Sequence, residues 1–217
     1  MDHSSIAPAI FYWGTPVVLV TTTNEDGTAN IGPVSSAWWL GNRCVLGLEG
    51  NSQTTLNMIR TKQCVLNLPD ETMVSNVNAL ARTTGTEEVP EIKIKLGYRY
   101  DKDKFKTSRL TPEDSLKVKP PRIRECPVQM ESEMIGIHEL MKDGPSELKG
   151  FLMAIEVRIV QTHIEEKLRL AGHANRVDSD KWKPMIMCFQ KLYGLKNGEL
   201  ASSTLAEIEE ETYRLPV

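Results

Sequence analysis

Between residues 15 and 69, short apolar runs alternate with polar turn residues, and this alternation constrains the fold more than any other feature of the chain. A β-branched run over residues 15–23 ends at Asn24-Glu25-Asp26-Gly27. An Asp-Gly pair between two such runs indicates a hairpin, because the turn needs a positive φ that glycine adopts without strain. Further strands are predicted over residues 29–34, 43–48 and 63–68. Short strands joined by tight turns favour a barrel or sandwich over a doubly wound sheet.

Two helices are predicted in and after this region. Residues 54–61 fit a short helix with Ser52 or Thr54 as its N-cap and with Leu56 and Ile59 pointing inward. Residues 71–82 predict a second helix, because apolar side chains recur there at helical spacing. These apolar side chains are Met73, Val77 and Leu80.

Residues 83–118 form a charged segment without clear periodicity, which we call the flap. A segment of this length and irregularity is typical of a functional lid or of an arm that crosses between subunits. Strands are predicted again over residues 128–141 and 151–163, and a last strand or extended stretch over residues 185–195. We expect a single domain over residues 1–217, mainly β with short helices. It would end in a tail (200–217), in which residues 202–213 predict a solvated helix.

Composition limits the class of protein. Of the 217 residues, 40% are hydrophobic and 25% are charged, which is typical of a globular chain that buries a real core. The net charge of −3, with no basic tract, argues against nucleic acid as a partner. The N-terminus has neither a basic signal region nor an apolar stretch long enough to cross a bilayer. We therefore expect a soluble, cytoplasmic protein that binds no membrane.

The cysteine pattern agrees with a reducing compartment. The four cysteines are far apart and form no C-x-x-C pair, so we expect buried free thiols. Cys126 precedes Pro127 and is the one for which we allow greater exposure and a reactive thiol. No His or Cys spacing resembles a zinc site, and we predict no metal. Hydrolase-elbow, dinucleotide and P-loop motifs are absent from the sequence, so a nicotinamide could bind only transiently.

Two polar clusters interrupt the first strands. Asn51-Ser52-Gln53-Thr54-Thr55 lies between a strand and a helix, where free amide N–H groups and hydroxyls form an anion site. The same residues could instead only cap the helix, and the two roles are compatible. In Ser35-Ser36-Ala37-Trp38-Trp39, small residues let the backbone approach a ring system and a Trp can close one edge. The alternative for this cluster is a β-bulge beside two core tryptophans.

Together the clusters suit a ligand that is flat and aromatic at one end and anionic at the other. Flavin mononucleotide (FMN) is such a ligand. His138 lies in an apolar run, Met134-Ile135-Gly136-Ile137-His138, and a lone histidine in a strand is more often structural than functional. The residues by themselves assign it no role.

The order and spacing of several short motifs resemble the flavin reductase-like, FMN-binding split-barrel family, which includes flavoredoxins. The similarity extends from about residue 15 to residue 195. Besides the run at 15–23, the motifs are Gly27-x-x-Asn30-Ile-x-Pro33-x-Ser35, Thr55-Leu-x-x-Ile59-Arg60, Val65-Leu-Asn67-Leu, Asp103-Lys104-Phe105, Glu125-Cys-Pro-Val-Gln-Met-Glu131, Gly136-x-His138 and Lys181-Trp-x-Pro184-Met-Ile186.

This resemblance implies a Greek-key split barrel of about six strands, a homodimer, and FMN bound without a covalent link near the subunit interface. By position, Asn30, Ser35, Ser36, Ala37 and Trp38 would line the flavin ring. Asn51, Ser52, Thr54 and Thr55 would hold the phosphate. Arg82, Thr83 and Thr84 would lie near the ring or the ribityl chain. Lys104 would favour the phosphate or the reduced flavin, and the resemblance places His138 near the cofactor.

The implied function is that of an FMN-dependent oxidoreductase of the flavin reductase type, with NAD(P)H as a possible donor and free flavin or a redox protein as a possible acceptor. The chemistry would be the cofactor's, so no acid–base residue is nominated. The alternatives are a flavoredoxin-type electron-transfer protein without NAD(P)H turnover and a non-enzymatic flavin-binding protein. The chain departs from the family pattern in two places. Residues 188–193 stand where many members carry a Gly-Gly before an aromatic pair, and the stretch over residues 85–99 is longer than in compact members.

Overall fold

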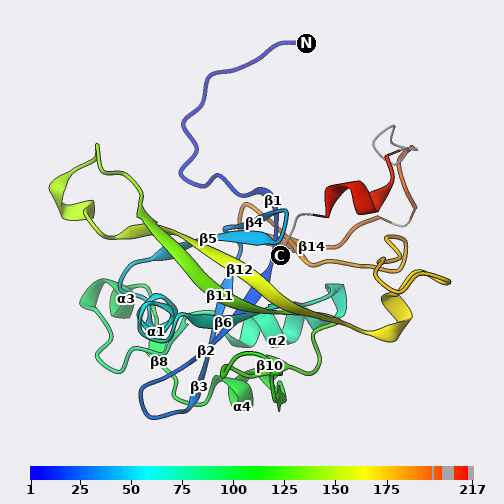
Figure 1. The fold of residues 1–217 in the computed structure, drawn as a ribbon. Coiled ribbons are helices and arrows are strands. Elements are labelled where there is room, and N and C mark those ends of the chain that lie inside the picture. Colours follow the sequence, from blue (N-terminus) through cyan, green and yellow to red (C-terminus); the bar gives the residue numbers. More distant parts are fainter. Residues whose placement is uncertain (197, 202–207, 215–217) are drawn as a thin grey trace.

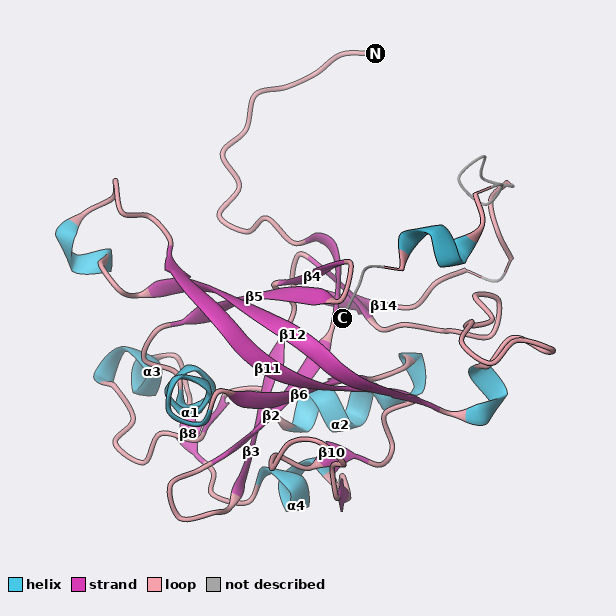
Figure 2. Ribbon diagram, viewed as in Figure 1, coloured by secondary structure: helices cyan, strands magenta, loops and turns pink. Residues whose placement is uncertain are grey.

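A seven-stranded antiparallel sheet organises the computed structural model, which describes residues 1–196, 198–201 and 208–214 (Figures 1 and 2). Consecutive strands β3 and β4 lie at its opposite edges, so the chain crosses from one edge to the other as in Greek-key connections. The two edges are not paired with each other, and the sheet stays open. Its strands, from edge to edge, are β3 (Ala29–Val34), β2 (Val18–Thr23), β6 (Gln63–Leu68), β11 (Val128–Glu139), β12 (Leu152–Ile164), β5 (Arg43–Glu49) and β4 (Ala37–Leu40).

Smaller pairings surround this sheet. The strands β1 (Trp13–Pro16), β13 (Ile186–Cys188) and β14 (Lys191–Tyr193) form a three-stranded sheet from the two ends of the chain. The flap contributes β7 (Thr83–Thr84), β8 (Arg99–Tyr100) and β9 (Pro112–Glu113), and β9 pairs with β10 (Arg122–Ile123). The helices are α1 (Gln53–Thr61), α2 (Val74–Ala79), α3 (Glu91–Lys95) and α4 (Lys104–Ser108). Single 3₁₀ turns are η1 (Glu71–Met73), η2 (Ser146–Leu148), η3 (Glu166–Leu168) and η5 (Glu210–Tyr213).

The mainly β prediction is confirmed, and several elements begin and end where we expected. The β2–β3 hairpin turns at Gly27, which has a φ of +83°, and Asn24 N–H donates to Thr28 O at 2.8 Å. The sheet has seven strands, in agreement with the expected number of about six, and the additional strand β4 begins within the second polar cluster. Part of the predicted tail helix, residues 202–207, lies outside the described residues. None of the described helices is long and apolar enough to span a membrane.

Strand β2 joins two hydrophobic cores, because its side chains alternate between the two faces of the sheet. Val18 and Val20 pack with Met58 and Ile155 on one face. On the other face, Val17 and Leu19 belong to a core covered by α2 and α4. The apolar residues predicted for the second helix, Met73, Val77 and Leu80, are all buried in that core, although η1 and a helix ending at Ala79 replace the continuous helix.

The orientation predicted for α1 is wrong. Leu56 and Ile59 are 46% and 41% exposed, and the helix instead buries a largely polar face with Asn57 at its centre. The Asn57 amide donates to Thr22 Oγ1 at 3.0 Å and to Asn24 Oδ1 at 2.8 Å. Because Thr22 is fully buried and Asn24 is partly buried, the polar groups of this hairpin need hydrogen-bond partners, and α1 supplies them. Hydrogen bonding rather than apolar content therefore sets the rotation of the helix.

The cysteines follow the buried-thiol prediction except at Cys188. Cys126 is buried rather than exposed, and burial raises the pKa of its thiol well above the usual range. Cys44 and Cys64 are buried as expected, and burial raises the pKa of Cys44 to about 12. Cys188 is the half-exposed thiol.

The end of the flap is held by a buried carboxylate. Glu131, on β11, is fully buried and accepts hydrogen bonds from the backbone N–H groups of Leu116, Lys117 and Val118. His163 Nε2 lies 2.7 Å from Glu131 Oε1, which also accepts from Leu116 N–H. Burial raises the pKa of Glu131, but the hydrogen bonds from the flap and from His163 outweigh it, and the net effect is a lowered pKa.

We predict that Glu131→Gln lowers the free energy of unfolding at pH 7 by about 2–4 kcal/mol, because it removes charge-assisted hydrogen bonds to buried N–H groups. A carboxyl with a lowered folded pKa stabilises the protein above its unfolded pKa of about 4.3, and this contribution is lost as the pH falls through the folded pKa. The difference between the variants should therefore shrink below pH 4. Urea unfolding at pH 7 and below pH 4 measures it.

The matched control is Glu133→Gln, two residues along the same strand. Glu133 pairs with Arg158 at 2.7 Å, and both side chains are more than a third exposed, so its loss should cost less than about 1 kcal/mol. Equal losses for the two variants would contradict the anchoring role of Glu131.

Candidate functional site

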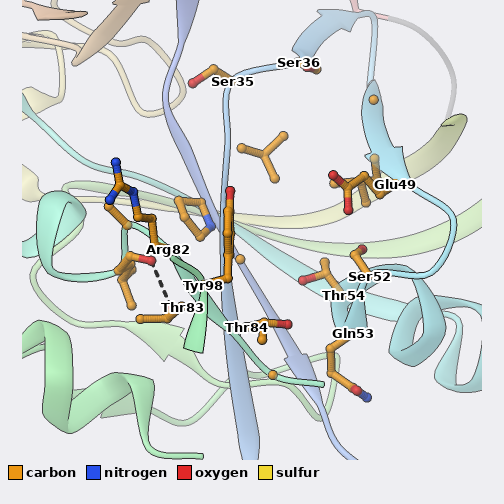
Figure 3. Close-up of a pocket in the computed structure, with 18 of the residues that line it drawn as sticks. Ser35, Ser36, Glu49, Ser52, Gln53, Thr54, Arg82, Thr83, Thr84 and Tyr98 are labelled. Atoms are coloured by element: carbon orange, nitrogen blue, oxygen red, sulfur yellow. Dashed lines mark hydrogen bonds between the residues drawn. The ribbon is translucent and has the colours of Figure 1, made fainter. Parts of the chain in front are cut away.

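A cavity of about 740 Å³ opens where the N-terminus of α1, the flap and the two chain ends meet the sheet (Figure 3). Four segments line it: the β3–β4 connection, the end of β5 with the start of α1, the flap, and the chain ends. Nine of the fourteen predicted site residues lie on its wall, and these are Asn30, Ser35, Ser36, Ser52, Thr54, Arg82, Thr83, Thr84 and Lys104. The fold thus brings both polar clusters and the flap residues to one site.

The start of α1 presents polar groups to the cavity. Ser52 is the N-cap, and its Oγ accepts from Thr55 N–H at 3.2 Å. The N–H groups of Gln53 and Thr54 precede the first intrahelical hydrogen bond, from Leu56 N–H to Ser52 O. Unpaired N–H groups and the positive end of the helix dipole together favour an anion here. Capping and anion binding therefore coexist, as the sequence allowed.

The two threonines of this cluster have different environments. Thr54 lines the cavity, and its Oγ1 accepts from Asn30 Nδ2 at 3.1 Å. Thr55 is fully buried and does not line the cavity. Its hydroxyl donates to Glu49 O at 2.8 Å and accepts from Ser52 Oγ at 2.9 Å, so it already has hydrogen-bond partners within the fold.

Asn30 carries an unsatisfied acceptor at the buried end of the cavity. Its amide donates to Thr54, but its Oδ1 is buried and has no hydrogen-bond partner among the described residues. Gly85 packs directly against this oxygen, since a Cβ at position 85 would lie 2.5 Å from it. An unpaired buried acceptor is costly, and a ligand that donates a hydrogen bond would remove that cost.

Lys104 places a cation beside the same wall. Its Nζ is buried and donates to Ile31 O at 2.9 Å. Burial lowers the pKa of Lys104 to about 8, with Asp101 acting to raise it and Lys93 to lower it further. The ammonium group is therefore close to half-protonated at mildly alkaline pH.

The flap forms the wall opposite α1, where Arg82, Thr83, Thr84 and Tyr98 face Ser52 and Thr54 (Figure 3). Arg82 has a left-handed φ of +56°, which a non-glycine residue adopts at some cost. Its carbonyl accepts from Arg99 N–H at 2.9 Å, so the parallel β7–β8 pairing begins at this bend. The bend turns the chain out of α2 and into the flap.

The second polar cluster divides between cavity and sheet. Ser35 and Ser36 line the cavity, and Ser36 Oγ lies 2.8 Å from Tyr12 Oη. Ala37 is buried in the core, whereas Trp38 is largely exposed on β4. In this chain neither Ala37 nor Trp38 lines the cavity, and Trp38 is not a core residue.

Two further predicted residues lie away from the cavity. Asn51 is exposed before α1, and His138 is exposed on the outer half of β11. Their predicted contacts with a cofactor remain predictions.

The structure also adds lining residues that sequence reasoning missed. They come from the chain ends, from the end of β5 and from the middle of the flap: Ile10, Tyr12, Glu49, Lys93, Tyr98, Met187, Phe189 and Gln190. In the sequence, the departure from the family pattern at residues 188–193 was the one indication of these lining residues, because that segment contains Phe189 and Gln190. Nothing local marks Tyr12, whose position depends on pairing between β1 and β13.

The described side chains that line the cavity carry a net positive charge, whereas the whole chain is negatively charged. The described lining residues include three cations, Arg82, Lys93 and Lys104, and one carboxylate, Glu49. A net positive cavity in a chain of net charge −3 favours an anionic ligand over a neutral one. Its volume is within the range of about 300–1,000 Å³ typical of small-molecule sites.

Comparison with known proteins agrees with this architecture. The chain is 37% identical over 190 residues to the uncharacterized protein YdfE of Bacillus subtilis (strain 168), with 88% of each chain covered. Its fold is similar to that of the flavoredoxin of Desulfovibrio vulgaris (Miyazaki F), with a TM-score of 0.73, 19% identity, and 95% and 98% of the two chains covered. The flavoredoxin from Methanosarcina acetivorans superposes with a TM-score of 0.71 at 17% identity, covering 94% and 96%.

The solved structures also include a protein with a split barrel domain from Shewanella frigidimarina NCIMB 400. It superposes with a TM-score of 0.66 at 16% identity, with 88% and 87% of the two chains covered. The split-barrel prediction is therefore confirmed. The family model of the flavin reductase like domain matches residues 12–177, which include the whole seven-stranded sheet and most of the cavity wall. The chain belongs to the flavin reductase-like domain family.

Proposed function

We propose that this protein is an FMN-binding oxidoreductase of the flavin reductase type. The observation that carries the proposal is the cavity itself, which combines hydroxyls, helix N–H groups and cations with the unsatisfied Asn30 Oδ1 on a neighbouring wall. Membership of the flavin reductase-like family supports a flavin as the ligand. The phosphate of FMN accounts for the polar, positive end better than an uncharged flavin does.

The residues divide into two groups under this proposal. Ser52 and Thr54, with the N–H groups of residues 53 and 54, would hold the phosphate. Ser35 and Ser36 would pack along the ring, where small side chains let the backbone approach, and Asn30 Oδ1 would accept from the ligand. Thr55 supports the site from behind, since its hydroxyl is bonded to Glu49 O and Ser52.

The redox chemistry would be supplied by the flavin, which can take up a hydride and pass electrons on. The described cavity residues would bind the flavin and orient it. NAD(P)H is an anionic donor. The net positive charge of the cavity would attract it, although the chain as a whole is negatively charged. The flap would limit which donor reaches the ring, because Tyr98 and Lys93 lie on the cavity wall.

A homodimer is also proposed. Leu56 and Ile59 on α1 and Ile135 and Ile137 on β11 are exposed, and the two elements meet where Met134 N–H donates to Lys62 O at 2.8 Å. A second copy would cover these side chains. His138 does not line the cavity of its own chain, so a cofactor contact by His138 would require the cavity of the partner copy. Light scattering of the purified protein tests the dimer.

The first experiment is the visible spectrum of the purified protein, before and after reconstitution with FMN. We expect flavin absorbance that bleaches on anaerobic addition of NADH or NADPH. Bleaching by a reduced ferredoxin-like donor alone would identify the electron-transfer alternative. Failure to bind FMN at all would refute the proposal.

The two threonines of α1 provide a sharper test. Thr54→Ala should weaken FMN affinity by roughly tenfold, because it removes a hydroxyl from the cavity wall, and it should lower the free energy of unfolding by about 1 kcal/mol, because the buried Asn30 amide loses an acceptor. Thr55→Ala should lower the free energy of unfolding by about 1–3 kcal/mol, since it removes a buried hydroxyl with two partners. Fluorescence titration and urea unfolding measure the two effects, and exposed Thr28→Ala is the control. Unchanged FMN affinity in Thr54→Ala would remove residue 54 from the site.

Lys104 makes FMN affinity depend on pH. Its pKa of about 8 in the free protein means that its charge is lost as the pH rises through 8, and an anion binds the charged form better. We expect the Kd of oxidised FMN to increase severalfold from pH 7 to pH 9. The increase should not exceed roughly tenfold, because the charged fraction of Lys104 falls by about that factor over this range. Lys104→Met should bind more weakly at pH 7 and show no such dependence. The same slope in Lys104→Met would show that another group titrates.

A further inference from the structure

The one carboxylate among the described lining residues is paired with a cation of the flap. Glu49, the last residue of β5, places Oε2 2.5 Å from Lys93 Nζ on α3 of the flap. No hydrogen bond is aligned on that oxygen although it is buried. Lys93 is 16% exposed and Glu49 37% exposed, so the pair is only partly screened by water. It is a close contact between opposite charges on two elements of the cavity wall.

Glu49 adjoins the proposed phosphate site. Its carbonyl accepts from Ser52 N–H at 3.1 Å and from the Thr55 hydroxyl at 2.8 Å, so its backbone forms the turn that leads into α1. Glu49, Ser52 and Thr54 lie on one wall of the cavity (Figure 3). A dianionic phosphate on this wall would be repelled by the Glu49 carboxylate and attracted by Lys93.

Helix α3, which carries Lys93, is held by few contacts. None of its residues is buried, and Ile92 and Ile94 are exposed. Beyond it, Tyr98 N–H donates to Lys93 O at 2.9 Å, and two-residue strands β7 and β8 attach the segment to the cavity wall. A segment with so little buried surface can shift at low cost, so the Lys93 side chain can exchange partners without disturbing the core.

We propose that Glu49 and Lys93 form an exchangeable ion pair that selects the phosphate-bearing form of the ligand. In the free protein, Lys93 neutralises Glu49 and draws α3 across the cavity. When a phosphate monoester occupies the N-terminus of α1, Lys93 leaves Glu49 and pairs with the phosphate. Riboflavin has no phosphate to replace the carboxylate, so it gains nothing from Lys93. This inference rests on the proposed FMN site and assigns two residues to it that sequence reasoning did not.

The two partners should have opposite effects on FMN affinity. Lys93→Met should raise the Kd of FMN by about tenfold or more, because it removes a charged partner and leaves Glu49 unpaired. Glu49→Gln should lower that Kd severalfold, because the carboxylate no longer competes for Lys93 or repels the phosphate. The Kd of riboflavin should change little in either variant. Fluorescence titration with FMN and with riboflavin measures all four values.

A matched control lies on the same helix. Lys95 and Glu91 form an exposed pair at 2.7 Å, with side chains 72% and 81% exposed, so Lys95→Met and Glu91→Gln change the same charges away from the cavity. These variants should leave both Kd values unchanged. Equal effects of Lys95→Met and Lys93→Met would attribute the change to net charge and overturn the proposal.

Two further outcomes separate this inference from the proposed function. If Glu49→Gln and Lys93→Met both weaken FMN binding, the pair only holds the flap in place and the exchange is refuted, while FMN binding by the unaltered protein still stands. If the unaltered protein binds neither FMN nor riboflavin, the proposed function itself fails. The double variant should bind FMN more tightly than Lys93→Met alone, since it removes the unpaired carboxylate.

Discussion

The buried hydrogen bonds between α1 and the β2–β3 hairpin are the contact on which the site depends. Asn57 donates to Thr22 and Asn24, and Asn30 donates to Thr54, so helix and hairpin hold each other through polar groups. Buried polar groups without partners are costly, and this network therefore allows one rotation of α1. That rotation aims Thr54 and the first N–H groups of the helix into the cavity and leaves Leu56 and Ile59 outside.

Local charge, not net charge, determines what this cavity can bind. The chain is acidic overall, yet Arg82, Lys93 and Lys104 converge on one space with a single carboxylate among the described lining residues. Two of these cations, Lys93 on α3 and Lys104 on α4, come from the flap, which the fold brings back against the start of α1. The flap is thus part of the binding wall rather than only a cover. It is tied down at its far end by Glu131 and at the cavity by short strands and one ion pair.

Elements governed by local physics were predictable. The Asp26-Gly27 turn follows from the φ that glycine allows, and β3 and β6 match their predicted residues because short runs bounded by turn residues leave few alternatives. The N-cap at Ser52 follows from the preference of a hydroxyl for the first free N–H groups of a helix. The prediction for Leu56 and Ile59 failed, because apolar periodicity ignores the hydrogen bonds that a buried hairpin demands.

The candidate site shows the same division. By itself the sequence determined the strand-rich fold, the two polar clusters and, through motif order, the family and the residues to inspect. Only the tertiary structure decided that Thr54 faces the cavity while Thr55 faces the fold, that Trp38 is exposed, and that Tyr12 and Phe189 complete the wall. It also placed Lys93 against Glu49, 44 positions apart in the sequence. The reason is that such contacts depend on how β5, the flap and the chain ends pack in space, and no local pattern of residues encodes that packing.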